Sequence, residues 1–189
     1  MVIDGFLDDY ESLRSLADAA KFCDLRSPQD GVIYPNINLD IAEEAKKEVT
    51  DKLCRLFNSG VNIRTIFSRL SLAGVKAPHQ AHTDAAMGQY SLMLYLNRPE
   101  HCAGGTAIVR HIETGAEKNP TTTEQEEIWK RDTNEYSAWE AVFMCDMKPN
   151  RAFIFPADLY HRAEPVSGFG TDATDGRLVL TAFFDLENA

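Results

Sequence analysis

Residues 78–84 read Pro-His-Gln-Ala-His-Thr-Asp, and they contain the most informative pattern of the chain. In an extended segment alternate side chains lie on the same side, so His82 and Asp84 are expected to point in one direction. An imidazole and a carboxylate are both good ligands for a divalent metal ion. Because His-x-Asp is common by chance, a metal site here requires a third ligand from another part of the chain.

His161 is the predicted third ligand, because it follows the apolar run 151–155 and Pro156, a pattern typical of the end of a strand. Two neutral imidazoles and one carboxylate on one face of an octahedral metal leave the opposite positions open, as in non-haem Fe(II) oxygenases. His79 is an alternative ligand, but we favour a position beside the ligands or in solvent for it.

Arg177 precedes the apolar segment 178–184, which is predicted to be a buried strand. A guanidinium group at the start of such a strand needs an anionic partner, and a carboxylate that accepts two hydrogen bonds fits best. A dicarboxylate cosubstrate would supply that partner. Arg69 also lies in an apolar strand pattern, and it either faces an active site or pairs with a buried carboxylate.

With these residues in place, the sequence resembles the Fe(II)/2-oxoglutarate-dependent dioxygenases, specifically their prolyl-hydroxylase-like branch. The resemblance extends over residues 69–186, and its elements occur in the order typical of the family. Besides the two histidines, Asp84 and Arg177, the matching segments are 95–97 (Tyr-Leu-Asn), 102–106 with its paired glycines, 155–156 (Phe-Pro) and 165–166 (Pro-Val).

The resemblance implies a role for each candidate site residue. The implied iron ligands are His82, Asp84 and His161. Arg177 would bind the distal carboxylate of 2-oxoglutarate, and a second contact to this cosubstrate would come from Tyr90 or Thr181. Because halogenases of this superfamily lack the carboxylate ligand, the presence of Asp84 favours hydroxylation.

The implied function is an Fe(II)- and 2-oxoglutarate-dependent oxygenase that hydroxylates an unactivated C–H bond and releases succinate and CO2. The substrate would be an amino-acid-like small molecule or a protein side chain, dioxygen would be the oxidant, and ascorbate is a possible supporting reductant. Two alternatives stay open. A cupin-like metal enzyme that is not an oxygenase would use the same three ligands without needing Arg177, and a non-catalytic acidic interaction module would contain His-x-Asp by accident.

The expected fold is a double-stranded β-helix, or jelly roll, in one domain over residues 1–189. Residues 1–60 are predicted to form supporting helices, one within 8–20 and one from a capping box at Asp40 and Glu43 to Gly60, separated by a loop at 28–35. Residues 61–189 are predicted to form the core, with a helical insertion near 121–147 that contains Trp129 and Trp139. The predicted strands are 63–72, 80–83, 90–96, 106–111, 151–155 and 178–184.

Composition limits the partners and the compartment. The chain has 189 residues, 44% of them hydrophobic, and a formal net charge of −10, so nucleic acid and anionic membrane surfaces are disfavoured as partners. The four cysteines are far apart in the sequence and are predicted to be reduced thiols. They are Cys23, Cys54, Cys102 and Cys145. With no signal peptide or apolar membrane span in the sequence, a cytoplasmic location is expected.

Three other charged or titratable residues have simpler interpretations. His101 is predicted to lie on the surface, and His111 to be a structural histidine with its hydrogen bonds satisfied. Arg162 follows His161 directly, so it would point to the opposite face and form a surface salt bridge.

Overall fold

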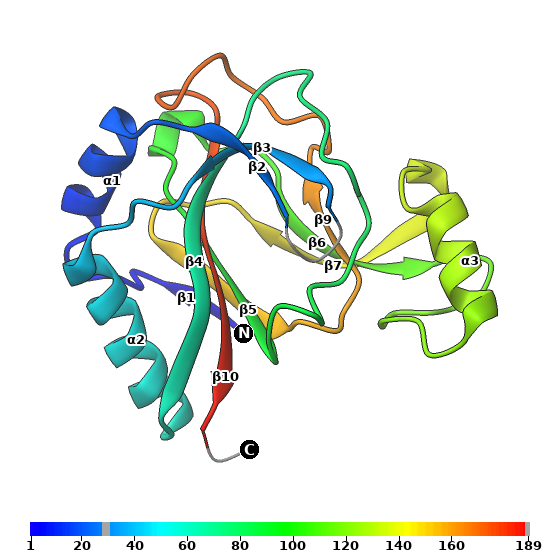
Figure 1. The fold of residues 1–189 in the computed structure, drawn as a ribbon. Helices are drawn as coiled ribbons and strands as arrows, with labels where there is room; N and C mark the ends of the chain where they lie inside the picture. Colours follow the sequence, from blue (N-terminus) through cyan, green and yellow to red (C-terminus); the bar gives the residue numbers. More distant parts are fainter. Residues whose placement is uncertain (28–30, 188–189) are drawn as a thin grey trace.

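Two antiparallel sheets and three α-helices make up the structure, a computed structural model that describes residues 1–27 and 31–187 (Figure 1). The larger sheet has the order β1-β8-β5-β10-β4-β3-β2, and the smaller one has the order β7-β6-β9. The strands of the larger sheet are β1 (Val2–Asp4), β2 (Cys23–Arg26), β3 (Ile33–Asn38), β4 (Val61–Ser71), β5 (Tyr90–Tyr95), β8 (Arg151–Pro156) and β10 (Arg177–Leu186). Those of the smaller sheet are β6 (Gly105–His111), β7 (Trp139–Asp146) and β9 (His161–Glu164).

Helices α1 (Tyr10–Ala19) and α2 (Glu43–Phe57) lie along one face of the larger sheet, opposite the smaller sheet (Figure 1). Val49 and Leu53 on α2 are fully buried in the cluster that joins this helix to the sheet. The predicted capping box is wrong, because α2 begins after Ala42 and has no side-chain cap. Helix α2 ends at Asn58, whose left-handed backbone (φ 49°) turns the chain toward β4.

Strand β10 occupies the centre of the larger sheet, paired with β4 on one side and β5 on the other. Its side chains alternate between the two faces. Leu178 and Leu180 join the cluster under the helices, whereas Val179 joins the cluster between the two sheets. This alternation places Arg177 and Thr181 on the inner face, between the sheets.

The predicted helical insertion is only partly right. Helix α3 (Thr123–Asp132) is present, but residues 139–146 form β7. Trp139 is buried at the start of β7, while Val142 and Phe143 are exposed because β7 is an edge strand. The pairing of β7 with β6 also shifts register between Ile108 and Val109, and this irregularity obscured the two-residue period in the sequence.

Two other predicted segments differ from the structure. The loop proposed at 28–35 overlaps β3, which pairs with β2; residues 28–30 of that loop lie outside the described part of the chain. Residues 80–83 do not form a strand, and their one ladder contact is an isolated bridge between His82 and His161. The core strands at 90–95, 105–111, 151–156 and 177–186 lie within a residue or two of their predicted bounds.

Gly105 lets β6 pass close to β7, because a Cβ atom at this position would overlap the carbonyl oxygen of Cys145. We therefore expect Gly105→Ala to lower the free energy of unfolding by about 3 kcal/mol or more, since the backbones must separate to admit a methyl group. Urea denaturation measures this. The matched control is Gly115→Ala, which has no atom near the added Cβ and a positive φ, and should cost about 1 kcal/mol. Equal losses in the two variants would contradict the packing argument.

Candidate metal centre

The two histidines of the predicted site are held together by the backbone. His82 lies in the segment between β4 and β5, and His161 is the first residue of β9. Each backbone N–H donates to the carbonyl oxygen of the other residue, at 3.1 and 2.9 Å. Their ring centroids are 4.4 Å apart. This isolated bridge brings two imidazoles from distant parts of the sequence to one point.

The Nδ1 atoms of both imidazoles face backbone carbonyl oxygens, which orients the rings. Nδ1 of His82 lies 3.2 Å from the oxygen of Gln80, and Nδ1 of His161 lies 3.1 Å from that of Leu159. Since a carbonyl oxygen only accepts, Nδ1 carries the proton in this arrangement and Nε2 has its lone pair free. Metal-binding histidines are commonly oriented in this way.

Asp84 completes a group of three ligand atoms that all lie within 4.8 Å of one another. Its carboxylate oxygens lie 3.7 Å from Nε2 of His82 and 3.2 Å from Nε2 of His161. Nε2 of His161 is buried and has no hydrogen-bond partner among the described residues. A buried nitrogen without a partner is costly unless something binds it. Two nitrogen atoms and one carboxylate also form the ligand set of non-haem Fe(II), so these residues fit that ion.

Electrostatics support neutral imidazole at His82. Desolvation, with a smaller contribution from the nearby His161, lowers the pKa of His82 to about 4, so this ring is uncharged near pH 7. For His161, desolvation opposes protonation, but the negative charge of the nearby Asp84 outweighs it and raises the pKa. Desolvation likewise acts against ionisation of Asp84, and the two imidazoles and Ser91 together lower its pKa, so the carboxylate is ionised.

Ser91 on β5 donates a hydrogen bond to Oδ2 of Asp84 at 3.1 Å, and both groups are buried. The sequence analysis missed this residue, whose signal was a small polar side chain within an apolar strand. We expect Ser91→Ala to weaken Mn(II) binding about 10- to 100-fold, because the carboxylate loses the contact that orients it. Calorimetric titration with Mn(II) measures this, and exposed Ser137→Ala is the control. Unchanged affinity in the first variant would show that Ser91 does not orient the ligand.

Arg177 lies on the inner face of β10, buried between the sheets. Its Nη2 donates to the carbonyl oxygen of Gly105 and to Oγ1 of Thr106, each at 3.2 Å, whereas its buried Nε has no partner among the described residues. Both acceptors are neutral, so its charge is not balanced by them. Burial of Arg177 lowers the pKa of its guanidinium group.

The structure separates the two candidates for a second cosubstrate contact. Thr181 is buried on the same face as Arg177, with Oγ1 3.4 Å from Sδ of Met93. Tyr90 does not join this site, since its ring packs against Phe57 and Phe184 on the helix-covered face. Ser91 takes the inner face of β5, and alternation therefore turns its neighbour Tyr90 outward.

A narrow cavity of about 40 Å³ lies next to His82 and Arg177. His79 lines it and packs against Trp129 at a centroid distance of 5.4 Å. Arg69 lines it as well, so of its two predicted alternatives the position at the candidate site is the observed one. The remaining lining residues come from β3, β4, the segment before His82, β9 and the turn after β9.

The other predicted roles have mixed outcomes. His111 is structural as predicted, because its nitrogens lie 2.9 Å from Oδ2 of Asp132 and 2.9 Å from Oγ1 of Thr114. The surface salt bridge predicted for Arg162 is wrong. Arg162 is 3% exposed, pairs with Glu164 at 2.6 Å and stacks on the ring of Tyr136, so it is part of the packing of the smaller sheet.

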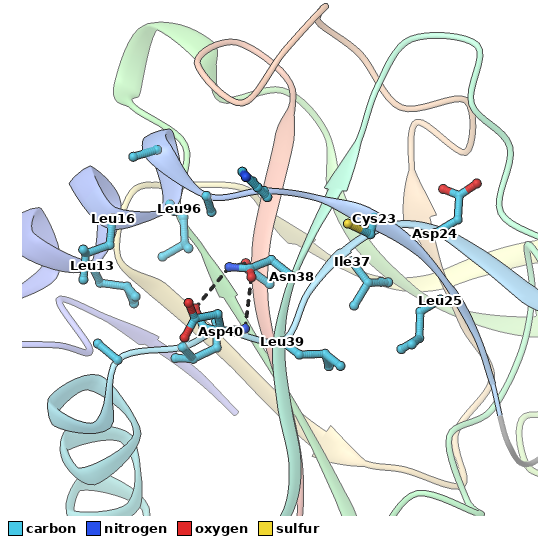
Figure 2. A pocket seen from close by; sticks show the side chains of 17 residues that line it. Leu13, Leu16, Cys23, Asp24, Leu25, Ile37, Asn38, Leu39, Asp40 and Leu96 are labelled. Atoms are coloured by element: carbon cyan, nitrogen blue, oxygen red, sulfur yellow. Dashed lines mark hydrogen bonds between the residues drawn. The ribbon is translucent and has the colours of Figure 1, made fainter.

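A larger hollow, about 650 Å³, lies on the other face of the larger sheet, away from the candidate ligands. Figure 2 shows it between α1 and the β2–β3 pair, with Asn38 at its centre hydrogen-bonded to the backbone of Asp40. Leu13, Leu16 and Leu25 line it with largely apolar surface. The buried polar group of this groove, Asn38, already has hydrogen-bond partners in Asp40 and Ser68, so size alone does not make the groove the reactive site.

Comparison with known proteins places the chain in a family. A model described as a family of unknown function, DUF6445, matches residues 1–184. The chain belongs to the DUF6445 family. No curated protein matches its sequence.

Solved structures show which fold this DUF6445 chain has. EctD from S. alaskensis with 2-oxoglutarate and 5-hydroxyectoine matches with a TM-score of 0.52 and 14% identity, over 98% of this chain and 71% of EctD. The collagen prolyl hydroxylase vCPH of Paramecium Bursaria Chlorella virus-1, a 2OG complex, matches with a TM-score of 0.50 and 13% identity, over 97% and 94%. SnoN, a non-haem α-ketoglutarate-dependent epimerase from nogalamycin biosynthesis, matches with a TM-score of 0.50 and 16% identity, over 97% of this chain and 76% of SnoN.

The DUF6445 chain therefore has the fold of the Fe/2-oxoglutarate-dependent oxygenases, and the predicted mostly-β jelly roll is confirmed. At these identities the likeness establishes the fold alone. Within residues 1–27 and 31–187, no helix is long and apolar enough to cross a membrane.

Proposed function

We propose that this DUF6445 protein is an Fe(II)- and 2-oxoglutarate-dependent oxygenase that hydroxylates an unactivated C–H bond of an amino-acid-like small molecule or a protein side chain. The observation that carries the proposal is the ligand group of two imidazoles and one carboxylate inside a fold shared with such oxygenases; Asp84 and His161 are buried, and Nε2 of His161 has no hydrogen-bond partner among the described residues. Arg177, buried without an anionic partner among the described residues, supplies the cosubstrate contact.

His82, Asp84 and His161 would hold Fe(II), which supplies the activation of dioxygen coupled to decarboxylation of 2-oxoglutarate. Arg177 binds the distal carboxylate of the cosubstrate and fixes its orientation, with Thr181 on the same strand face. Ser91 keeps Asp84 in the orientation that ligation needs. Overall, one oxygen atom enters the new hydroxyl group and the other enters succinate, while CO2 is released.

Burial is the second contribution of this chain. Asp84 and His161 are buried between the two sheets and only His82 is partly exposed, which limits the access of bulk water to the ligand atoms and so limits side reactions. Two features separate the proposal from its alternatives. A metal enzyme of another class has no use for the buried cation Arg177, and an interaction module has no use for a buried imidazole nitrogen that lacks a hydrogen-bond partner among the described residues. The fold also supports other outcomes, since SnoN is an epimerase, and hydroxylation is our choice among them.

We place the activity in the cytoplasm, because the four cysteines are all free, as expected of a reducing compartment. Dioxygen and 2-oxoglutarate are then the partners besides the substrate, and ascorbate would act only to keep the metal reduced.

The proposal predicts that purified protein with Fe(II), 2-oxoglutarate and oxygen releases succinate, and that a chelator stops this release. The uncoupled reaction without substrate is slow, so succinate is measured by mass spectrometry over hours. Calorimetry with Mn(II) in place of iron tests cosubstrate binding separately. If 2-oxoglutarate binds neither the Mn(II)-loaded protein nor the iron-loaded protein, the oxygenase assignment is wrong.

A further inference from the structure

The cavity beside His82 has an unusual electrostatic character. Arg69, Arg177, His79 and His82 all line it, and no aspartate or glutamate is among its described lining residues. The chain as a whole has a formal net charge of −10, so this local excess of cationic and basic groups opposes the average. A cavity of this kind selects anionic ligands, because the surrounding low polarity strengthens their attraction.

Arg69 is the second buried cation of this cavity. It lies on β4 opposite Val179 of β10, and Arg177 lies opposite Ser71, so the two arginines emerge from adjacent strands toward the same inner face. Its buried Nε has no hydrogen-bond partner in the described part of the chain. The guanidinium carbon lies 5.8 Å from the centroid of the Tyr34 ring, which supports it from one side without neutralising it.

The charge of Arg69 persists at neutral pH. Burial, followed by repulsion from Arg177, lowers its pKa to about 10, which still leaves the group protonated near pH 7. Two like charges in one narrow cavity destabilise each other unless an anion lies beside each. The cavity thus contains two groups that can bind anions, Arg69 and Arg177. Binding of the distal carboxylate of 2-oxoglutarate uses only Arg177.

A count of charges in the occupied site shows that Arg69 would lack a counterion. The charges of a divalent metal ion and of Arg177 are together balanced by Asp84 and the two carboxylates of 2-oxoglutarate. The charge of Arg69 is then left without a counterion inside the site, and a buried unpaired charge is costly. Dioxygen is neutral, so the substrate is the component of the proposed reaction that could supply this counterion.

We propose that Arg69 binds a carboxylate of the substrate, and that the substrate is therefore a small carboxylic acid oriented with its acid group toward β4. This inference rests on the proposed oxygenase function and narrows it, favouring a free acid over a neutral side chain of a protein. A carboxylate fits better than a phosphate, because it carries the single charge that Arg69 balances, whereas a phosphate monoester carries nearly two at pH 7. The planar fork of the guanidinium also matches a carboxylate through two parallel hydrogen bonds.

The test is calorimetry on the full chain loaded with Mn(II) and saturated with 2-oxoglutarate, so that binding is measured without turnover. The probes are the standard L-amino acids and their N-acetyl derivatives, each as the free acid and as its amide, at millimolar concentration. At least one acid is expected to bind about tenfold or more tightly than its amide, the effect of a charge-assisted hydrogen bond. In Arg69→Gln this ratio is expected to fall to about one, while 2-oxoglutarate binds as in the wild type.

Controls separate the possible failures. Arg64→Gln is the matched control, because Arg64 lies on the same strand but is paired with Asp185 at the surface; it should retain the wild-type ratio. Arg69→Lys keeps the charge and should retain part of the preference for the acid over its amide. This variant therefore still tests the inference if Arg69→Gln fails to fold.

Equal binding of all acids and amides to the wild type, with 2-oxoglutarate bound, overturns this inference alone. Loss of 2-oxoglutarate binding in Arg69→Gln also overturns it, since Arg69 would then hold the cosubstrate. Absence of 2-oxoglutarate binding in the wild type overturns the proposed function as well.

Discussion

His161→Ala is expected to abolish stoichiometric metal binding and 2-oxoglutarate-dependent succinate release. The variant removes one of three ligand atoms from a group that spans 4.8 Å. Changing only an outer contact of a metal ligand typically lowers affinity 10- to 100-fold, so loss of the ligand itself should lower it by at least about 100-fold. Metal content by mass spectrometry after dialysis, together with succinate release, measures both effects.

The control for this variant is His101→Ala, which removes a histidine that lies in the short 3-10 helix Pro99–His101 and is not in the ligand group. It should bind metal and release succinate as the wild type does. Circular dichroism of the metal-free proteins tests whether His161→Ala retains the fold, since its backbone hydrogen bonds with His82 remain possible. Full metal content in His161→Ala would remove this residue from the ligand set and end the proposal in its present form.

Arg177→Ala is expected to raise the dissociation constant of 2-oxoglutarate by about 100-fold, because a bidentate, charge-assisted contact to a carboxylate is lost in a poorly solvated site. Metal binding should change little, since the hydrogen bonds of Arg177 go to Gly105 and Thr106 and not to His82, Asp84 or His161. Calorimetry on the Mn(II)-loaded protein separates the two effects. The variant thus differs from His161→Ala, which loses the metal first.

Arg177→Lys provides the graded comparison. Lysine keeps the positive charge but lacks the planar fork, so an intermediate dissociation constant is expected. Arg64→Ala, at the surface of β4, should leave the affinity for 2-oxoglutarate unchanged. If Arg177→Ala binds the cosubstrate as tightly as the wild type, the distal carboxylate lies elsewhere, and Arg69 becomes the alternative contact.

The central strands could be predicted from the sequence because their burial is continuous. In β5 and β10 almost every side chain is buried, on one face by the helices and on the other by the smaller sheet, which leaves long apolar runs. Strands β7 and β3 were missed for the opposite reason, since both are partly exposed and contain polar residues or proline. Exposure removes the hydrophobic pattern on which such predictions depend.

The candidate site could likewise be predicted from the sequence only in part. The pair of ligands in residues 78–84 followed from local alternation, although the segment is a loop with one isolated bridge. The meeting of His82 with His161 depends on long-range pairing, which the family resemblance supplied and local pattern could not. The sequence shows Ser91 as a polar residue in an apolar strand but not its hydrogen bond to Asp84, and it does not show that Arg69 lacks a partner, because hydrogen-bond pairing is a property of the packed structure. The burial of Arg162 was not predicted, because strand alternation indicates the face on which a side chain lies and does not show whether other residues cover that face.

Strand β10 lies at the centre of the larger sheet but is the last of its strands in the sequence, so the sheet is completed late in protein synthesis. Strands β4 and β5 both leave the ribosome long before residues 177–186, yet each pairs with β10 in the finished sheet. Until that last strand emerges, the nascent chain carries two unpaired edges rich in apolar side chains, and such edges promote aggregation. Yield of folded protein in cells is therefore expected to depend on chaperones that bind the unfinished chain more than on the stability of the mature domain.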